Sequence, residues 1–110
     1  MRNALKSSIT ARVHLRSARG FETKILALCD TELLGKCFTQ GEKTLDLKAY
    51  RSFYEGYTVT EIQAVELLRN AENVNIVGEK SVAAAQKALG FNKANVKKIK
   101  GIPHLQFYRI

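Results

Sequence analysis

The sequence predicts an α+β fold, a two-layer sandwich in which two helices cover one face of a mainly antiparallel sheet. Residues 9–16 alternate between apolar and polar side chains, which is typical of a half-buried strand. Residues 59–71 and 79–89 carry apolar side chains three and four positions apart, which is typical of amphipathic helices. The predicted strands outnumber these helices and come first in the chain. The other face of the sheet is therefore expected to be open and partly polar.

The chain is predicted to begin with a flexible basic arm, residues 1–8, which lacks apolar periodicity. A single α+β domain is expected over residues 9–110. Its first strand, residues 9–16, turns at residues 17–20 into an apolar run over residues 24–29. These two strands are expected to form a hairpin, with the apolar run in the centre of the sheet.

The next segment is predicted to hold a second, smaller hairpin. Asp30 can cap a single helical turn that Gly35 ends. Short strands over residues 36–40 and 43–48 follow, joined by a tight turn. Residues 49–57 are rich in aromatic side chains and are expected to form a packed loop.

The two helices are predicted in the second half of the chain. Thr58 and Glu61 match a capping box at the start of the helix over residues 59–71. The apolar stripe of this helix is predicted to consist of Ile62, Ala64, Val65, Leu67, Leu68 and Ala71. The helix over residues 79–89 is expected to end at Gly90.

Three further strands complete the predicted sheet. One covers residues 73–77, just before the second helix. The other two cover residues 96–100 and 104–110, around a turn at residues 101–103.

The composition is that of a soluble globular domain. The chain has 110 residues, of which 45% are hydrophobic and 25% are charged, and this argues against disorder. No apolar run approaches the ~20 residues of a membrane span, and the N-terminus lacks the apolar stretch of a secretory signal. The two cysteines and two histidines have no paired spacing and predict neither a zinc site nor a disulfide framework. We therefore expect a cytoplasmic protein with no cofactor, no metal and no membrane partner.

Basic residues are concentrated at the two ends of the chain. Residues 1–21 hold five cations and residues 80–110 hold seven, and neither segment has a carboxylate. All ten acidic residues lie within residues 22–79, and the whole chain has a formal net charge of +8. If the fold brings the two ends together, they form one surface that attracts polyanions.

This charge pattern favours a non-enzymatic RNA-binding protein of the ribosome or translation apparatus, with ribosomal RNA or another structured RNA and ribosomal proteins as partners. The outward faces of the first and last strands supply cations and stacking side chains, which suit RNA. The residues predicted to contact RNA phosphates are Arg12, Arg16, Lys97, Lys98 and Lys100. His14 and Tyr108 are predicted to stack on bases, and the N-terminal arm is expected to become ordered on binding. The alternative for these positions is a solvated, basic sheet face.

A phosphate-binding turn is a further possibility at the start of the second helix. Gly78, Lys80 and Ser81 place a glycine and free backbone amides at a helix N-terminus, where an anion can bind. The segment lacks the second glycine of a nucleotide-hydrolase phosphate loop. A glycine that simply serves a tight turn remains the alternative.

Two other functions compete with RNA binding. Cys29 beside a helix start and His104 could form the nucleophile and base of a small thiol-dependent enzyme. The alternative for this pair is a buried thiol and a structural histidine. The acidic segment over residues 55–79 could instead make the chain a protein-interaction module with a basic partner.

Several stretches together resemble a small archaeal family known only as a domain of unknown function. The stretches that carry this resemblance are CDTELLGK at residues 29–36, FYEG at 53–56, NIVGE at 75–79 and GIPHLQ at 101–106. The resemblance spans most of residues 10–108. It implies an archaeal cytosolic protein with an α+β sandwich, and it implies no activity, cofactor or catalytic residue.

Overall fold

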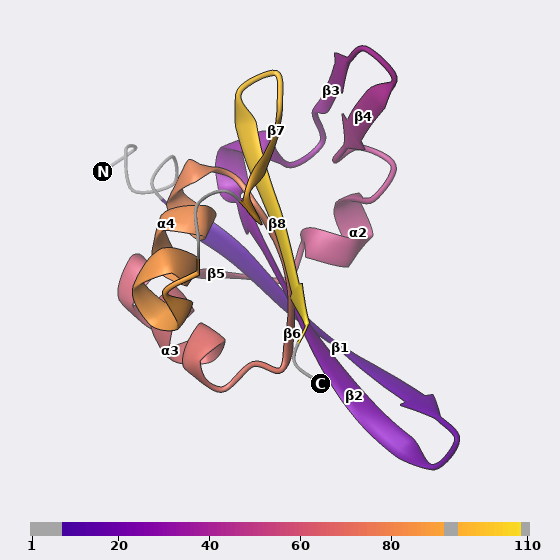
Figure 1. Ribbon diagram of the computed structural model, residues 1–110, viewed down its shortest axis with the longest axis vertical. Coiled ribbons are helices and arrows are strands. Elements are labelled where there is room, and N and C mark those ends of the chain that lie inside the picture. Colours follow the sequence, from indigo (N-terminus) through magenta and orange to yellow (C-terminus); the bar gives the residue numbers. More distant parts are fainter. Residues whose placement is uncertain (1–7, 92–94, 109–110) are drawn as a thin grey trace.

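The computed structural model describes residues 8–91 and 95–108 and confirms the predicted α+β class (Figure 1). In chain order the elements are β1 (Ile9–Ala18), β2 (Phe21–Asp30), the 3₁₀ turn η1 (Thr31–Leu33), β3 (Cys37–Gln40), β4 (Lys43–Asp46), α2 (Arg51–Tyr54), β5 (Tyr57–Val59), α3 (Glu61–Arg69), β6 (Asn73–Val77), α4 (Glu79–Leu89), β7 (Lys97–Ile99) and β8 (Ile102–Tyr108). None of the described helices has both the length and the apolar character needed to cross a bilayer.

Six of the strands form one curled sheet in the order β5-β1-β2-β6-β8-β7, and β3 and β4 form a separate hairpin. All neighbouring strands in the large sheet are antiparallel except β2 and β6, which are parallel. The sheet is therefore mainly antiparallel, as the sequence predicts, and the apolar strand β2 lies near its centre. The edge strand β5 was not predicted, because residues 57–59 are too few to show a strand period.

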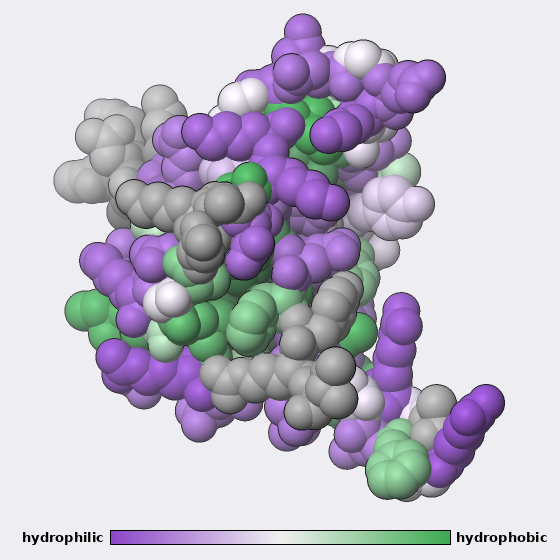
Figure 2. Space-filling model, viewed as in Figure 1, coloured by the Kyte–Doolittle hydropathy of each residue, from purple (hydrophilic) through white to green (hydrophobic). Residues whose placement is uncertain are grey.

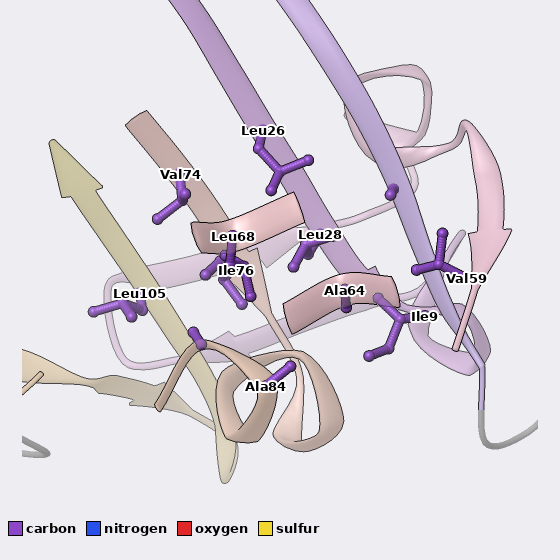
Figure 3. Packing of buried hydrophobic residues seen from close by; sticks show 12 residues of the cluster. Ile9, Leu26, Leu28, Val59, Ala64, Leu68, Val74, Ile76, Ala84 and Leu105 are labelled. Atoms are coloured by element: carbon purple, nitrogen blue, oxygen red, sulfur yellow. The ribbon is translucent and has the colours of Figure 1, made fainter. Parts of the chain in front are cut away.

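The helices α3 and α4 pack against one face of the large sheet (Figure 3). The sheet contributes Leu26 and Leu28 from β2 and Ile76 from β6, which are at most 4% exposed. The helices contribute Leu68 and small residues such as Ala84, which let the helix backbone approach the sheet closely. This cluster also contains Ile9, Ala11, Val59, Ala64, Val74, Ala85 and Leu105.

The opposite face of the sheet is also partly covered, so the expectation of an open second face was wrong there. The sheet residues Ala27, Cys29 and Val77 are fully buried on that face. They form a second apolar cluster with Leu33, Leu45, Leu47, Tyr54 and Ile99. None of its members comes from α3 or α4: four of the added five lie in the segment from η1 to α2, and Ile99 lies in β7. A simple two-layer sandwich is therefore not confirmed.

The start of α3 differs from the prediction by two residues. Thr60, not Thr58, is the N-cap: its Oγ1 accepts the Gln63 amide at 3.2 Å, and the Gln63 side chain accepts the Thr60 amide at 2.9 Å. Thr58 is unavailable because it belongs to β5 and pairs with Thr10. The helix also turns Ile62 outward, with 76% of its surface exposed, so this residue is not part of the buried stripe.

The last two strands meet at Lys100 and Gly101, where both residues have positive φ angles of 54° and 77°. This turn lies one residue earlier than predicted. Pro103 consequently sits inside β8, opposite Lys98 of the edge strand β7.

Candidate nucleic-acid interface

The hairpin of β1 and β2 extends beyond the rest of the sheet (Figure 1). Its ten residue pairs run from Ile9↔Asp30 to Ala18↔Phe21. The neighbouring strand β5 pairs with β1 only at residues 9–11, and β6 pairs with β2 only at residues 25–29. The last four pairs thus have no neighbouring strand on either side and extend about 13 Å from the sheet. We call residues 12–24 the ribbon.

The ribbon is strongly basic. It carries four cations, Arg12, Arg16, Arg19 and Lys24, and one carboxylate, Glu22. All four cations are exposed, and none makes an ion pair with another described residue. Hydrophilic side chains gather on this projection in Figure 2. Because no carboxylate of the described residues pairs with them, the charges of these cations are available to a polyanion.

Apolar side chains are exposed on the same ribbon. Leu15 is 60% exposed and Phe21 is 76% exposed, while Val13 is 44% exposed. The sequence pattern predicted that Val13 and Leu15 face the core. They do lie on the same sheet face as Ile9 and Ala11, but they are exposed, because β1 continues past the part of the sheet that α3 and α4 cover.

His14 is held within the fold, which limits its predicted role in stacking on bases. Its ring stacks on Phe53 with centroids 4.4 Å apart and planes 10° apart, and its Nε2 lies 2.8 Å from the Phe53 carbonyl oxygen. Arg12 also donates from Nη1 to the Glu55 carbonyl oxygen at 3.1 Å. These contacts fasten α2 to β1, so one face of the His14 ring is already occupied.

The predicted cations at the two ends of the chain do not converge. Two strands, β2 and β6, lie between β1 and β8. The lysines of β7 are about 19 Å from β1 across the sheet at ordinary strand spacing. Lys97 pairs with His104 and Lys98 with Pro103, so these two lysines project from opposite faces.

The other residues predicted to contact RNA at the two ends of the chain lie in different places. Lys100 is exposed in the β7–β8 turn, and its amide donates to Gln40 Oε1 at 2.6 Å. The Tyr108 side chain and residues 1–7 of the predicted arm lie outside the described residues.

A groove runs along the second face of the sheet, between the sheet and the segment from β4 to α2. We call it the α2 groove, and its volume is about 650 Å³. It is lined by Arg16, Thr44, Leu45, Asp46, Leu47, Tyr50, Phe53, Tyr54, Asn75, His104 and Gln106. Arg16 joins the groove to the ribbon, and Tyr50 stands at its rim with 64% of its surface exposed.

A polar network forms one wall of the α2 groove. Asn75 Oδ1 accepts a hydrogen bond from the Tyr54 hydroxyl at 2.8 Å and lies 3.1 Å from His104 Nε2. An amide oxygen can only accept, so Nε2 of His104 carries the proton and Nδ1 holds the lone pair. Burial, assisted by the positive charge of Lys97, lowers the pKa of His104 below its ordinary value of 6.5. The imidazole is therefore neutral at pH 7.

The predicted phosphate-binding turn is occupied by a side chain of the protein itself. Asp30 is 4% exposed, and its carboxylate accepts the amides of Lys80 at 3.1 Å and Ser81 at 2.8 Å. It also accepts the Ser81 hydroxyl at 2.8 Å. Asp30 thus caps α4 across about fifty residues of sequence, instead of the turn that follows it. An incoming phosphate would have to compete with this buried carboxylate.

Gly78 is required by this cap. Its φ angle is 108°, and an added Cβ would collide with the Asp30 carboxylate. Lys80 then places its ammonium 2.7 Å from Glu32 Oε1. The turn is a structural junction between the end of β2 and the start of α4.

Cys29 and His104 are not arranged as a nucleophile and base. Cys29 is fully buried, and its Sγ donates to the Asp30 carbonyl oxygen at 3.4 Å. Burial, with a smaller contribution from the nearby Asp30, raises the pKa of the thiol to about 12. In the sheet register Val77 stands between Cys29 and His104. No group of three or more His, Cys, Asp or Glu side chains in the described residues could hold a metal ion.

The acidic segment over residues 55–79 has much of its charge neutralised within the molecule. Three of its carboxylates make ion pairs of 2.7–3.1 Å, namely Glu55 with Arg51, Glu61 with Lys87 and Glu66 with Arg69. These pairs reduce the field that a basic partner would meet.

Sequence reasoning missed Arg19 and Lys24 as site residues, although a signal for them was present. The apolar run of β2 begins only at Ile25, whereas residues 21–24 are mostly polar. A strand that changes from polar to apolar along its length leaves the core at its polar end. The Tyr54–Asn75 contact had no comparable signal, because the two residues belong to elements far apart in the chain.

The comparisons with known proteins agree with this fold. The structure is similar to the crystal structure of an uncharacterized conserved protein from the archaeon Methanopyrus kandleri, with a TM-score of 0.78 and 25% sequence identity. The similarity covers 94% of this chain and 92% of that one. No curated protein matches the sequence significantly. Residues 19–110 match the family described as "Protein of unknown function (DUF424)". The chain therefore belongs to this family, as the sequence resemblance implied.

Proposed function

We propose that this protein binds structured RNA through the ribbon, as a non-enzymatic cytosolic protein associated with the translation apparatus. The observation that carries the proposal is a basic two-stranded element whose four exposed cations lack ion-pair partners in the described chain. Three of them, Arg16, Arg19 and Lys24, lie where this element projects beyond the sheet. Phosphate contacts supply most of the affinity of nucleic-acid-binding proteins. The net charge of +8 adds a long-range electrostatic attraction for the negatively charged RNA.

The chemistry of the ribbon fits RNA loops and bulges better than a regular duplex. The major groove of an A-form helix is too deep and narrow for side chains to read, whereas loops present unstacked bases. Three of the four cations are arginines, whose planar guanidinium groups bind phosphate oxygens in pairs. The exposed ring of Phe21 offers a surface on which an unstacked base can lie.

A salt titration with a matched pair of double variants tests the ribbon. Binding of a ribosomal RNA fragment that contains loops is measured by fluorescence anisotropy from low to physiological salt. Each phosphate contact contributes about −0.7 to −0.9 to the slope of log K against log salt. The variant Arg16→Gln/Arg19→Gln is expected to weaken binding and to make this slope shallower by about 1.4 to 1.8.

The control removes the same charge elsewhere. Lys98→Gln/Lys100→Gln changes two exposed cations at the β7–β8 edge and should leave the slope nearly unchanged. Equal effects of the two double variants would mean that net charge alone drives binding, and that the ribbon has no special role. Affinity that is absent, or independent of salt, would remove the RNA proposal altogether.

Association with the translation apparatus needs a separate experiment. The protein is followed on a sucrose gradient of native lysate, with and without nuclease. We expect nuclease-sensitive co-sedimentation with a ribosomal subunit. Sedimentation as a free small protein under both conditions would contradict this part of the proposal while leaving RNA binding itself intact.

A further inference from the structure

The α2 groove combines an apolar floor, an aromatic rim and unused polar atoms. Leu45 and Leu47 are at most 7% exposed, and they line the groove beside the exposed Tyr50. Its volume of about 650 Å³ falls within the range of ligand sites, which is about 300–1,000 Å³. A groove of this kind suits a flat molecule with polar edges.

The polar wall of the groove is fixed in orientation, yet it retains hydrogen-bonding capacity. Tyr54 and His104 both engage Oδ1 of Asn75, which holds that amide in one orientation. The Nδ2 group of Asn75 and Nδ1 of His104 make no hydrogen bond to any described residue. The Gln106 amide is exposed and also makes none. The wall thus offers donors from Asn75, an acceptor from His104, and both from Gln106.

The charges around the groove point to an anionic end on the ligand. Arg16 lines the groove on the ribbon side and has no ion pair within the described chain. Asp46 is the only carboxylate among the lining residues, and its Oδ1 already accepts the amides of Lys48 at 3.1 Å and Ala49 at 2.9 Å. A phosphate beside Arg16 would also meet the basic ribbon.

We propose that the α2 groove binds one unpaired nucleotide, with its base between Tyr50 and the Asn75–His104–Gln106 wall and its phosphate at Arg16. This inference rests on the proposed RNA binding and extends it from backbone contact to recognition of a splayed base. A base supplies a flat ring for stacking on Tyr50 and polar edges for the amides. The nucleotide could come from single-stranded RNA or from the free nucleotide pool, and the experiment separates these sources.

The test compares two exposed tyrosines. Tyr50→Ala removes the aromatic rim of the groove, whereas Tyr57→Ala removes a tyrosine on the edge strand β5, outside the groove. Both side chains are more than half exposed, so neither substitution should disturb folding, which circular dichroism verifies. The probes are fluorescein-labelled A5 and U5 oligoribonucleotides and a fully paired RNA duplex.

Stacking of a base on an aromatic side chain is worth about 5- to 150-fold in affinity by alanine substitution. We expect Tyr50→Ala to weaken binding of the single strands by at least about tenfold and to leave duplex binding unchanged. Tyr57→Ala should change neither. In the wild-type protein, the side-chain amide resonances of Asn75 and Gln106 should shift in ¹⁵N spectra when A5 or U5 is added.

The outcomes separate this inference from the ribbon proposal. If Tyr50→Ala binds the single strands as tightly as the wild type does, the groove inference is overturned and the ribbon proposal stands. If the wild type binds no RNA, the ribbon proposal fails, and AMP and UMP then decide the groove by themselves. Shifts of the Asn75 and Gln106 amide resonances with either mononucleotide support the α2 groove as a site for a free nucleotide. If neither mononucleotide shifts these resonances, the groove inference is overturned.

Discussion

Replacing Asp30 by alanine should be among the most damaging single substitutions in this protein. The change removes the acceptor for the amides of Lys80 and Ser81 and for the Ser81 hydroxyl. Ser81 is fully buried, so water cannot readily replace the lost carboxylate. A buried donor left without an acceptor costs about 1–3 kcal/mol, and an N-terminal helix charge adds up to about 1 kcal/mol. The Ser81 hydroxyl can rotate and adds little to this cost. We therefore expect the free energy of unfolding to fall by about 3–5 kcal/mol.

This loss is large compared with the stability of a small domain, which is about 5–15 kcal/mol. It should lower the melting temperature by about 12–20 °C, at roughly 4 °C per kcal/mol for a chain of this size. Urea denaturation followed by far-ultraviolet circular dichroism measures the change in the free energy of unfolding. Asp30→Asn keeps one acceptor oxygen, so a loss of about 2 kcal/mol is expected.

Asp46→Ala is the matched control. Asp46 also accepts two backbone amides, those of Lys48 and Ala49, but both of these residues are exposed. Water can therefore satisfy the freed amides, and the expected cost is about 1 kcal/mol or less. The reasoning is refuted if Asp30→Ala costs no more than Asp46→Ala.

Three further predictions concern the same core and the α2 groove. Gly78→Ala should destabilise the protein by about 3 kcal/mol or more, because its φ of 108° and the adjacent carboxylate both oppose a side chain; Gly20→Ala, at a φ of 82° with open space around it, should cost about 1 kcal/mol by the same denaturation assay. Thiol titration at pH 7 should label the exposed Cys37 quickly and the buried Cys29 only after denaturation, because a pKa of about 12 leaves roughly one thiol in 10⁵ ionised. The free energy of unfolding should fall as the pH is lowered below 6.5, because the depressed pKa of His104 lets the unfolded chain bind a proton first.

Each of these predictions has a result that would contradict it. Similar losses for the two glycine variants would show that the carboxylate contact with Gly78 is unimportant. Labelling of both thiols at equal rates in the native protein would contradict the burial of Cys29. For His104, the stabilising contribution is fully present above pH 6.5 and is lost as the pH falls through the lower pKa of the folded state. His104→Gln should therefore flatten the pH dependence in that window, and an unchanged slope would contradict its assignment.

Much of the secondary structure could be read locally. The alternation over residues 9–16 identified β1, and Gly90 marked the end of α4, where its φ of 64° satisfies the C-cap. The capping box of α3 was misplaced, because two threonines only two residues apart, Thr58 and Thr60, can both serve as the N-cap. Pairing of Thr58 with Thr10 decided between them, and that contact spans most of the first half of the chain.

The candidate site was less accessible to sequence reasoning than the fold. The exposed cations Arg12 and Arg16 were correctly placed on one face of β1, because strand alternation sets side-chain direction. Their separation from the lysines of β7 was not foreseeable, because the order of strands across a sheet does not simply follow their order in the sequence. The α2 groove was also missed, since its walls come from four segments that meet only after the sheet has formed.

The sequence by itself determined the α+β class, most element positions, the basic character of the chain and the family, because these depend on local periodicity, turn residues and composition. Only the tertiary structure determines which charges share a surface. It also determines that Asp30 caps a helix about fifty residues away and that Tyr54, Asn75 and His104 come together. The physical reason is that these features depend on strand order and long-range burial, which short-range patterns do not encode.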